Sequence, residues 1–143
     1  MLIVWHPRLS PTPLEHAPMT HGTILLAEDD PMIQKVLARM ITRAGYEGAV
    51  AVFADAAAAL EFTARVGGAL DLILVDTNLH DDGDAVFFHA LRALAPATPI
   101  VASSGHSEEQ LRGPDHFAGC DLHRVLSKPF GLQDIKDLIA SLP

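Results

Sequence analysis

The chain has 143 residues, of which 49% are hydrophobic, and its formal net charge is -8 at pH 7. This length and apolar content suit a single domain with one sizeable core, and 18 acidic against 10 basic residues argue against a nucleic-acid-binding surface. No apolar run approaches the roughly 18–20 residues that span a bilayer, which argues against a membrane protein. A single cysteine, Cys120, and the lack of a secretion signal predict a cytoplasmic location.

Residues 1–22 differ from the rest of the chain because they contain four helix- and strand-breaking prolines, Pro7, Pro11, Pro13 and Pro18. We predict a flexible N-terminal extension over residues 1–22 and one domain over residues 23–142. One alternative is a docking arm in which residues 2–5 are apolar anchors. Another is that Met19 is the natural start of the protein.

From residue 23 onward, short apolar runs alternate with helical periodicity, a pattern typical of a parallel sheet covered by helices. Strands are predicted at residues 23–27, 49–53, 72–75, 99–102 and 123–126. The first helix is capped by Asp30 and ends before Gly45, and its apolar stripe comprises Ile33, Val36, Leu37, Met40 and Ile41.

Three further helices are predicted at residues 56–65, 84–94 and 132–142. A fourth helix, between the last two of these, starts near Glu108. We expect it to be short or broken, because Gly113 and Pro114 follow after little more than one turn.

Acidic residues collect where two of the predicted strands end. Glu28 and Asp29 follow the first strand, and Asp76 follows the third. Ligands of open parallel sheets bind beyond the carboxyl ends of the strands, so these acids are expected to converge. A hard dication offsets their repulsion, and Mg²⁺ takes one or two carboxylates with water and carbonyl oxygens. We predict a magnesium site formed by Glu28, Asp29, Asp76 and the backbone carbonyl of Asn78.

The remaining strand ends supply a hydroxyl group, from Ser104, and an ammonium group, from Lys128. Together with a metal ion they match the peripheral oxygens of a phosphoryl group. Asp76 is then the attacking oxygen, because a carboxylate can form an aspartyl phosphate.

The stretches "ILLAEDDP", "LDLILVDTNL", "PIVASSG" and "LSKPF", in this order and at these spacings, resemble the receiver domains of two-component response regulators over about residues 23–142. The resemblance implies a flavodoxin-like, doubly wound α/β fold with strand order 2-1-3-4-5 and five helices. It also implies that Asp76 is the phosphoacceptor, Ser104 the hydroxyl that moves toward the phosphoryl group, and Lys128 its counter-ion. A cis peptide bond before Pro129 is implied as well.

The resemblance further implies that the phosphodonor is a phosphohistidine on a partner histidine kinase or phosphotransfer protein, as in a phosphorelay. The domain would catalyse its own phosphorylation and slow dephosphorylation, with no separate turnover substrate. Because the sequence ends directly after the last predicted helix, output is expected to pass through protein contacts. One such contact is a homodimer through the face of the fourth helix, fifth strand and fifth helix.

Several positions depart from the family pattern. His80 replaces the usual proline, Gly83 comes one position early, and Val125 stands where a switch aromatic is expected, a role that His123 could take over. These departures motivate an alternative, a pseudo-receiver that acts as a phosphorylation-independent interaction module. A magnesium phosphohydrolase with Asp76 as nucleophile is disfavoured, because Asn78 occupies the position of its general acid.

Overall fold

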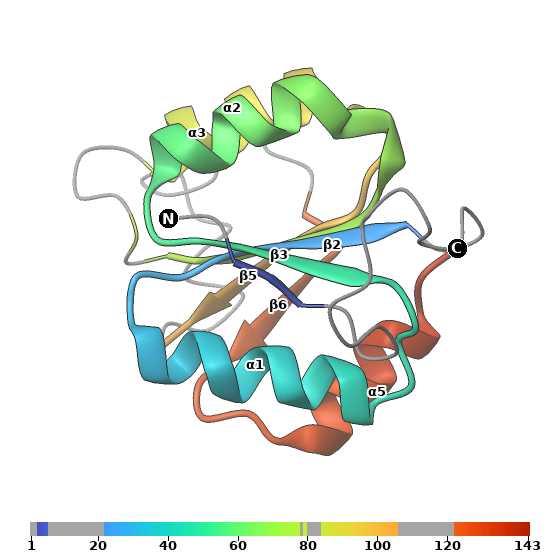
Figure 1. The fold of residues 1–143 in the computed structure, drawn as a ribbon. Coiled ribbons are helices and arrows are strands. Elements are labelled where there is room, and N and C mark those ends of the chain that lie inside the picture. The colour runs from blue at the N-terminus through green and yellow to red at the C-terminus, as the bar shows by residue number, and fades with distance from the viewer. Residues whose placement is uncertain (1–2, 6–21, 78, 80–83, 106–121) are drawn as a thin grey trace.

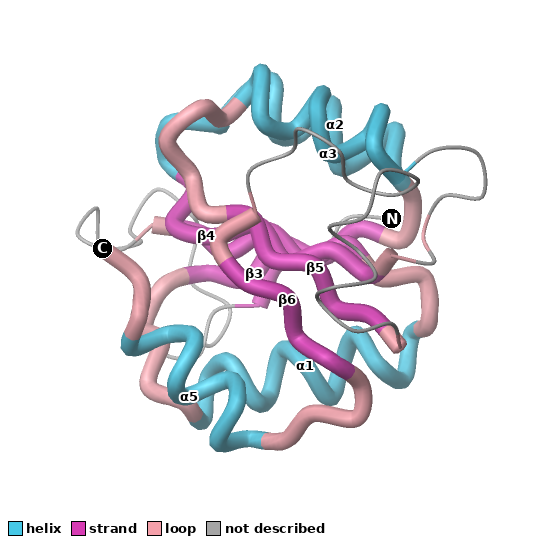
Figure 2. Tube along the Cα trace, turned by 180° about the vertical axis from the view of Figure 1, so that it is seen from behind, coloured by secondary structure: helices cyan, strands magenta, loops and turns pink. Residues whose placement is uncertain are grey.

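The computed structural model describes residues 3–5, 22–77, 79, 84–105 and 122–143. A central sheet lies between two layers of helices, with α2 (Ala56–Val66) and α3 (Asp84–Leu94) on one face and α1 (Pro31–Arg43) and α5 (Leu132–Ala140) on the other. Figure 1 and Figure 2 show this three-layer arrangement from opposite sides.

Five parallel strands form the body of the sheet: β2 (Thr23–Ala27), β3 (Ala49–Phe53), β4 (Leu70–Asp76), β5 (Ile100–Ser104) and β6 (Arg124–Ser127). Their order is β3-β2-β4-β5-β6, which confirms the predicted order 2-1-3-4-5. The first two strands have the predicted bounds. The third is longer at both ends, and the last two start one residue later than predicted and extend further.

A sixth strand, β1 (Ile3–Trp5), lies within the segment for which the sequence indicated a flexible extension. It pairs antiparallel with β3 and occupies the edge of the sheet. This strand is not predicted from the sequence, because three apolar residues followed by a proline-rich stretch carry no strand periodicity.

The helices follow the predicted positions closely. The second helix is continued by a short 3-10 turn, η2 (Gly67–Ala69), and the last ends two residues earlier than predicted. The predicted fourth helix lies outside the described residues. Among the described residues, none of the helices combines the length and the hydropathy that a membrane span requires.

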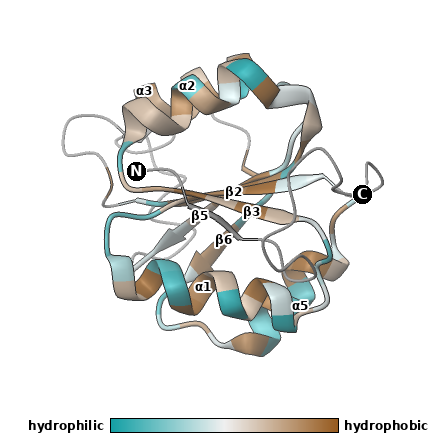
Figure 3. Ribbon diagram, viewed as in Figure 1, coloured by the Kyte–Doolittle hydropathy of each residue, from teal (hydrophilic) through white to brown (hydrophobic). Residues whose placement is uncertain are grey.

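Two apolar cores fill the space between the layers. Side chains alternate along each strand, so Leu25 packs toward α2 and α3, whereas Leu26 packs toward α1 and α5. Phe88 anchors the first core and Ile135 the second, and both are fully buried. Figure 3 shows α1 with hydrophobic and hydrophilic segments, as expected for a helix with one face on the sheet.

The buried face of α1 matches the predicted stripe except at Val36, since Ile33 and Met40 are partly buried against the core. The buried residues are Gln34, Leu37, Ala38 and Ile41, which follow the i, i+3, i+4, i+7 spacing. Val36, predicted to belong to the stripe, is 45% exposed. Val36 is therefore the one stripe residue that leaves the core, and the polar Gln34 belongs to the buried face although its side chain is not apolar.

Helix α1 begins directly after the candidate site residues Glu28 and Asp29, and its N-cap holds the backbone at this point. The Asp30 side chain accepts hydrogen bonds from the backbone N–H of Met32 at 2.9 Å and of Ile33 at 3.4 Å. This is the predicted N-cap, which satisfies N–H groups that have no partner within the helix.

We predict that Asp30→Ala lowers the free energy of unfolding by about 1 kcal/mol, because the first turn of α1 loses its cap. Asp30→Asn is the matched control, since it removes the charge but keeps a capping oxygen. Urea unfolding of the three proteins measures the difference. Equal losses in both variants would show that charge, and not capping, is the contribution of Asp30.

Candidate functional site

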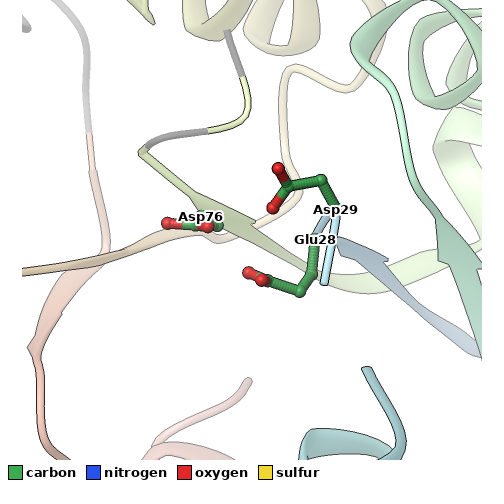
Figure 4. Close-up of side chains that lie close together, drawn as sticks. All are labelled: Glu28, Asp29 and Asp76. Atoms are coloured by element: carbon green, nitrogen blue, oxygen red, sulfur yellow. The ribbon is translucent and has the colours of Figure 1, made fainter. Parts of the chain in front are cut away.

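Three carboxylates meet at the carboxyl end of the sheet (Figure 4). Glu28 and Asp29 directly follow β2, and Asp76 is the last residue of β4. One oxygen from each lies within 4.8 Å of the others. The register explains the meeting, because Ala27 pairs with Val75 and the next residue of each strand is an acid. The predicted convergence of Glu28, Asp29 and Asp76 is therefore present.

The three acids differ in their exposure to water. Glu28 is 1% exposed and Asp76 is 5% exposed, whereas Asp29 is exposed. Burial of a carboxylate disfavours its charged form unless a hydrogen bond or an opposite charge compensates. The buried pair therefore needs compensation, and Asp29 is the member that solvent reaches.

Lys128 supplies one compensating charge. Its Nζ lies 3.1 Å from Asp76 Oδ1, and its side chain is 28% exposed. The lysine follows β6, and the peptide bond between Lys128 and Pro129 is cis, as the family resemblance implied. Residues 52 positions apart in the chain are thus brought into one ion pair.

Ser104 is the last residue of β5 and is fully buried. Asp76 pairs with Ser103, and Ser104 pairs with Ser127 in the next strand. The backbone N–H of Lys128 donates to the Ser104 carbonyl oxygen at 2.7 Å. Ser104 therefore lies between the strand that carries the acid and the segment that carries the lysine.

The carboxyl group of Glu28 has a raised pKa. Burial, followed by the adjacent carboxyl of Asp76, raises the pKa of Glu28 to about 7. A backbone hydrogen bond from Asp30 and the charge of Lys128 offset part of this rise. Its Oε1 accepts a hydrogen bond from the backbone N–H of Asp30 at 3.3 Å. Its buried Oε2 has no hydrogen-bond partner among the described residues. An oxygen that is buried without a partner is unusual and suits a cation or a water bound to one.

The donor set is chemically consistent with Mg²⁺, which prefers hard oxygen ligands and few carboxylates. Two buried acids and one solvent-facing acid leave one side open for water or a substrate oxygen. Asn78, the fourth predicted ligand, lies outside the described residues, as do His80 and Gly83.

One residue that positions the site, Gln34, was not predicted from the sequence. The Gln34 side-chain amide, on the buried face of α1, donates to the backbone carbonyl of Glu28. A polar residue on the buried spacing of a helix was the available signal, because such a group needs a partner. Gln34 ties α1 to the residue that begins the acidic cluster.

His123 does not occupy the place suggested for it behind Ser104. It precedes β6 at the end of the strand opposite to Lys128, and its Nε2 is 3.0 Å from Ser141 Oγ at the end of α5. Val125, by contrast, is 8% exposed and belongs to the core beneath α2 and α3.

A doubly wound parallel sheet with acids and a lysine at its carboxyl edge defines a receiver-type fold and site. The response regulator receiver domain family matches residues 24–140, and the chain belongs to this family. Domains of this family function in two-component signalling, receive phosphoryl groups from histidine kinases and bind Mg²⁺ in an acidic site.

Two solved structures illustrate the similarity. The receiver domain of the sensor histidine kinase PA1611 from Pseudomonas aeruginosa PAO1, with a magnesium ion in its active-site cleft, is 26% identical. The match covers 83% of this chain and 94% of that one, with a TM-score of 0.69. The chemotaxis protein CheY4 of Vibrio cholerae is 22% identical over 86% of this chain and 99% of that one, also with a TM-score of 0.69.

Curated relatives are longer. The DNA-binding transcriptional regulator NtrC of Bradyrhizobium sp. (strain RP501 Parasponia) is 29% identical over 123 residues, 85% of this chain but 23% of that protein. The same regulator of Rhizobium meliloti (strain 1021) is 28% identical over 121 residues, 85% of this chain and 24% of its own length. The chain thus spans about a quarter of the curated relatives that it matches.

The raised pKa of Glu28 predicts a pH dependence of stability in the absence of divalent cations. Between the ordinary value of 4.5 and about 7, the unfolded chain has released this proton and the folded chain still holds it. The free energy of unfolding therefore falls as pH rises through this interval, by at most about 3 kcal/mol from this group. Glu28→Gln should remove this contribution.

The measurement is urea unfolding in a chelating buffer across that pH interval, for the wild type and Glu28→Gln. The difference between the two proteins isolates Glu28 from other titrating groups. An identical pH dependence would show that Glu28 titrates normally in the folded protein.

Proposed function

We propose that the chain accepts a phosphoryl group on Asp76, with Mg²⁺, from a histidine kinase or a phosphotransfer protein, and signals through phosphorylation-dependent protein contacts. The supporting observation is the ion pair of Lys128 with Asp76 beside the carboxylates of Glu28 and Asp29. A structural salt bridge does not require two further acids at the same place.

In this proposal Asp76 is the nucleophile. A carboxylate oxygen of Asp76 forms a bond to phosphorus while the bond from phosphorus to the donor imidazole nitrogen breaks, and the electron pair stays on that nitrogen. The products are an aspartyl phosphate and a histidine. Hydrolysis later transfers the phosphoryl group to water and restores the carboxylate.

Lys128 and Ser104 have different roles in this step. Lys128 is a point charge already next to Asp76, and it pairs with a phosphoryl oxygen once the carboxylate has been phosphorylated. Ser104, at the end of the adjacent strand, donates its hydroxyl hydrogen to another phosphoryl oxygen. Both groups stabilise charge that collects on the phosphoryl oxygens.

Glu28, Asp29, Asp76 and the backbone carbonyl of Asn78 are the proposed Mg²⁺ ligands, directly or through water. The ion supplies charge stabilisation for phosphoryl transfer. The buried Oε2 of Glu28 supports this assignment, because a bound cation or a water on it provides the missing partner.

The partners and the location follow from the same proposal. A kinase or a phosphotransfer protein presents the phosphohistidine at the carboxyl edge of the sheet, in the cytoplasm. A homodimer through the face of the fourth helix, β6 and α5 is one output contact. The fourth-helix part of that face lies outside the described residues.

A pseudo-receiver remains the second candidate function, and the observation that favours it is Val125. This residue is buried in the core, where the family pattern has a switch aromatic. A small aliphatic side chain cannot swing as a ring does when the hydroxyl moves, so phosphorylation and output would be uncoupled.

We predict that incubation with acetyl phosphate and Mg²⁺ adds one phosphoryl unit to the wild type, measured by intact mass. Asp76→Asn should show no gain, because the amide is not a nucleophile. Asp71→Asn is the matched control, since Asp71 lies on the same strand but pairs with Tyr46 far from the site. Chelation of Mg²⁺ should suppress the gain in both competent proteins.

The absence of an Asp76-dependent gain would reject the proposed function. A gain that leaves the affinity for a purified partner and the oligomeric state unchanged would instead favour the pseudo-receiver. Intact mass and partner binding, measured on the same sample, therefore distinguish the phosphorylation-dependent receiver from the pseudo-receiver.

A further inference from the structure

Strand β1 covers an edge that the family-matched part of the chain would otherwise leave open. The family match starts at residue 24, whereas β1 comprises Ile3–Trp5. Its register on β3 joins Ile3 with Val52, Val4 with Ala51 and Trp5 with Val50. In Figure 1, β1 runs along β3 on the side away from β2.

The backbone of β3 shows which of its groups need a partner at that edge. The Phe53 carbonyl accepts from Glu28 N–H at 3.0 Å, and Ala49 N–H donates to the Gly22 carbonyl at 3.3 Å, so both residues face β2. Backbone groups alternate between the two edges of a strand. Ala51 therefore also faces β2, and the N–H and carbonyl of Val50 and Val52 face outward.

The sequence of β3 contains nothing that would discourage pairing with another chain. It reads Ala-Val-Ala-Val-Phe, with no charge and no proline, and its residues pack into the two cores. Natural edge strands are normally protected by charges, prolines or a cover. In this protein the cover is β1, so the protection of the β3 edge depends on the three residues of β1.

Strand β1 pairs with β3 through only three residues, and the number of residues between β1 and β2 exceeds what the distance between them requires. Trp5 pairs with Val50 and Thr23 pairs with Ala49, so the end of β1 and the start of β2 lie at the same end of the sheet. Two strand spacings, roughly 10 Å, separate them. Residues 6–22 could reach roughly 50 Å when extended. Strand β1 can therefore leave the edge without pulling β2 out of the sheet.

We propose that the outer edge of β3 is a strand-pairing surface for a second copy of this chain, and that β1 keeps the chain monomeric by occupying it. When β1 detaches, two β3 strands pair antiparallel around a twofold axis at Ala51. The two sheets then continue into one another across the dimer.

A second copy fits this edge because β3 is complementary to itself. Antiparallel pairing centred on Ala51 sets Val50 of each copy opposite Val52 of the other copy. Those are the residues whose backbone groups face outward, so both strands satisfy them at once. The register of β1 is centred on the same residue, with Val4 opposite Ala51. The two occupants are therefore mutually exclusive.

The charges at the two ends of β3 oppose this dimer. Glu47 precedes the strand and Asp55 follows it. The twofold axis brings Glu47 of one copy near Asp55 of the other. Their repulsion is screened by salt. The dimer is therefore weakest at low ionic strength, which gives β1 an advantage there.

The test uses the full-length protein with prolines in β1. Because Val50 and Val52 face outward, their partners Ile3 and Trp5 turn their N–H groups toward β3, whereas the N–H of Val4 points away. The double variant Ile3→Pro/Trp5→Pro removes both inward donors. Val4→Pro is the matched control, since it adds a proline to the same strand but removes only an outward donor.

Molar mass is measured by light scattering over a concentration series, at low and at moderate salt. The double variant is expected to double its mass as concentration rises, more readily at moderate salt. The wild type and Val4→Pro should stay monomeric. A double variant that stays monomeric at all concentrations, or that forms only larger aggregates, overturns the proposal, as does equal dimerisation of Val4→Pro.

Amide hydrogen exchange locates the contact. In the wild type and in the dimer, the amides of Val50 and Val52 are expected to be protected, and in dilute monomeric double variant they exchange rapidly. The Ala51 amide, which faces β2, is protected in all three and serves as an internal control. Rapid exchange at Val50 and Val52 within a dimer would place the contact elsewhere and overturn the proposal. Neither measurement requires phosphorylation, so the outcome is independent of the proposed function.

Discussion

The site depends on the electrostatic compensation of two buried carboxylates. Glu28 and Asp76 lie side by side with almost no contact with water, and Lys128 forms an ion pair with Asp76. One ammonium group does not balance Glu28, Asp76 and the adjacent Asp29. Burial, and after it the carboxyl group of Asp76, raises the pKa of Glu28. In the proposed function, a bound dication would resolve the imbalance, and an anionic phosphoryl group would then be tolerated next to the acids.

The strand register of the fold brings the charged residues of the site together. Parallel strands end at one edge, so residues 28, 76, 104 and 128 meet although the chain separates them widely. The two apolar cores on either face hold the strand ends in place, and Gln34 fixes the carbonyl of Glu28 from α1. The same architecture leaves β3 as an edge, which explains why a strand outside the family-matched part is paired there.

The sequence predicted the parts that depend on repetitive patterns. The strand positions follow from the apolar runs, and the meeting of Glu28 with Asp76 follows from the acids at their ends. The strand order was implied by the family resemblance, and it is confirmed. The sequence did not predict β1, because pairing over three residues depends on the partner strand and not on local periodicity. It also missed Gln34, since an apolar stripe was sought and a polar residue with a backbone partner was on the buried face. Asn78 and the predicted fourth helix lie outside the described residues, so the structure does not test these two predictions.

The most direct test of charge compensation is a calorimetric Mg²⁺ titration of the wild type, Glu28→Gln and Lys128→Met. The account predicts saturable binding by the wild type at millimolar Mg²⁺, weaker binding by Glu28→Gln, and tighter binding by Lys128→Met, because the lysine and the dication compensate the same acids. Absent binding in the wild type, or weaker binding in Lys128→Met, would contradict it.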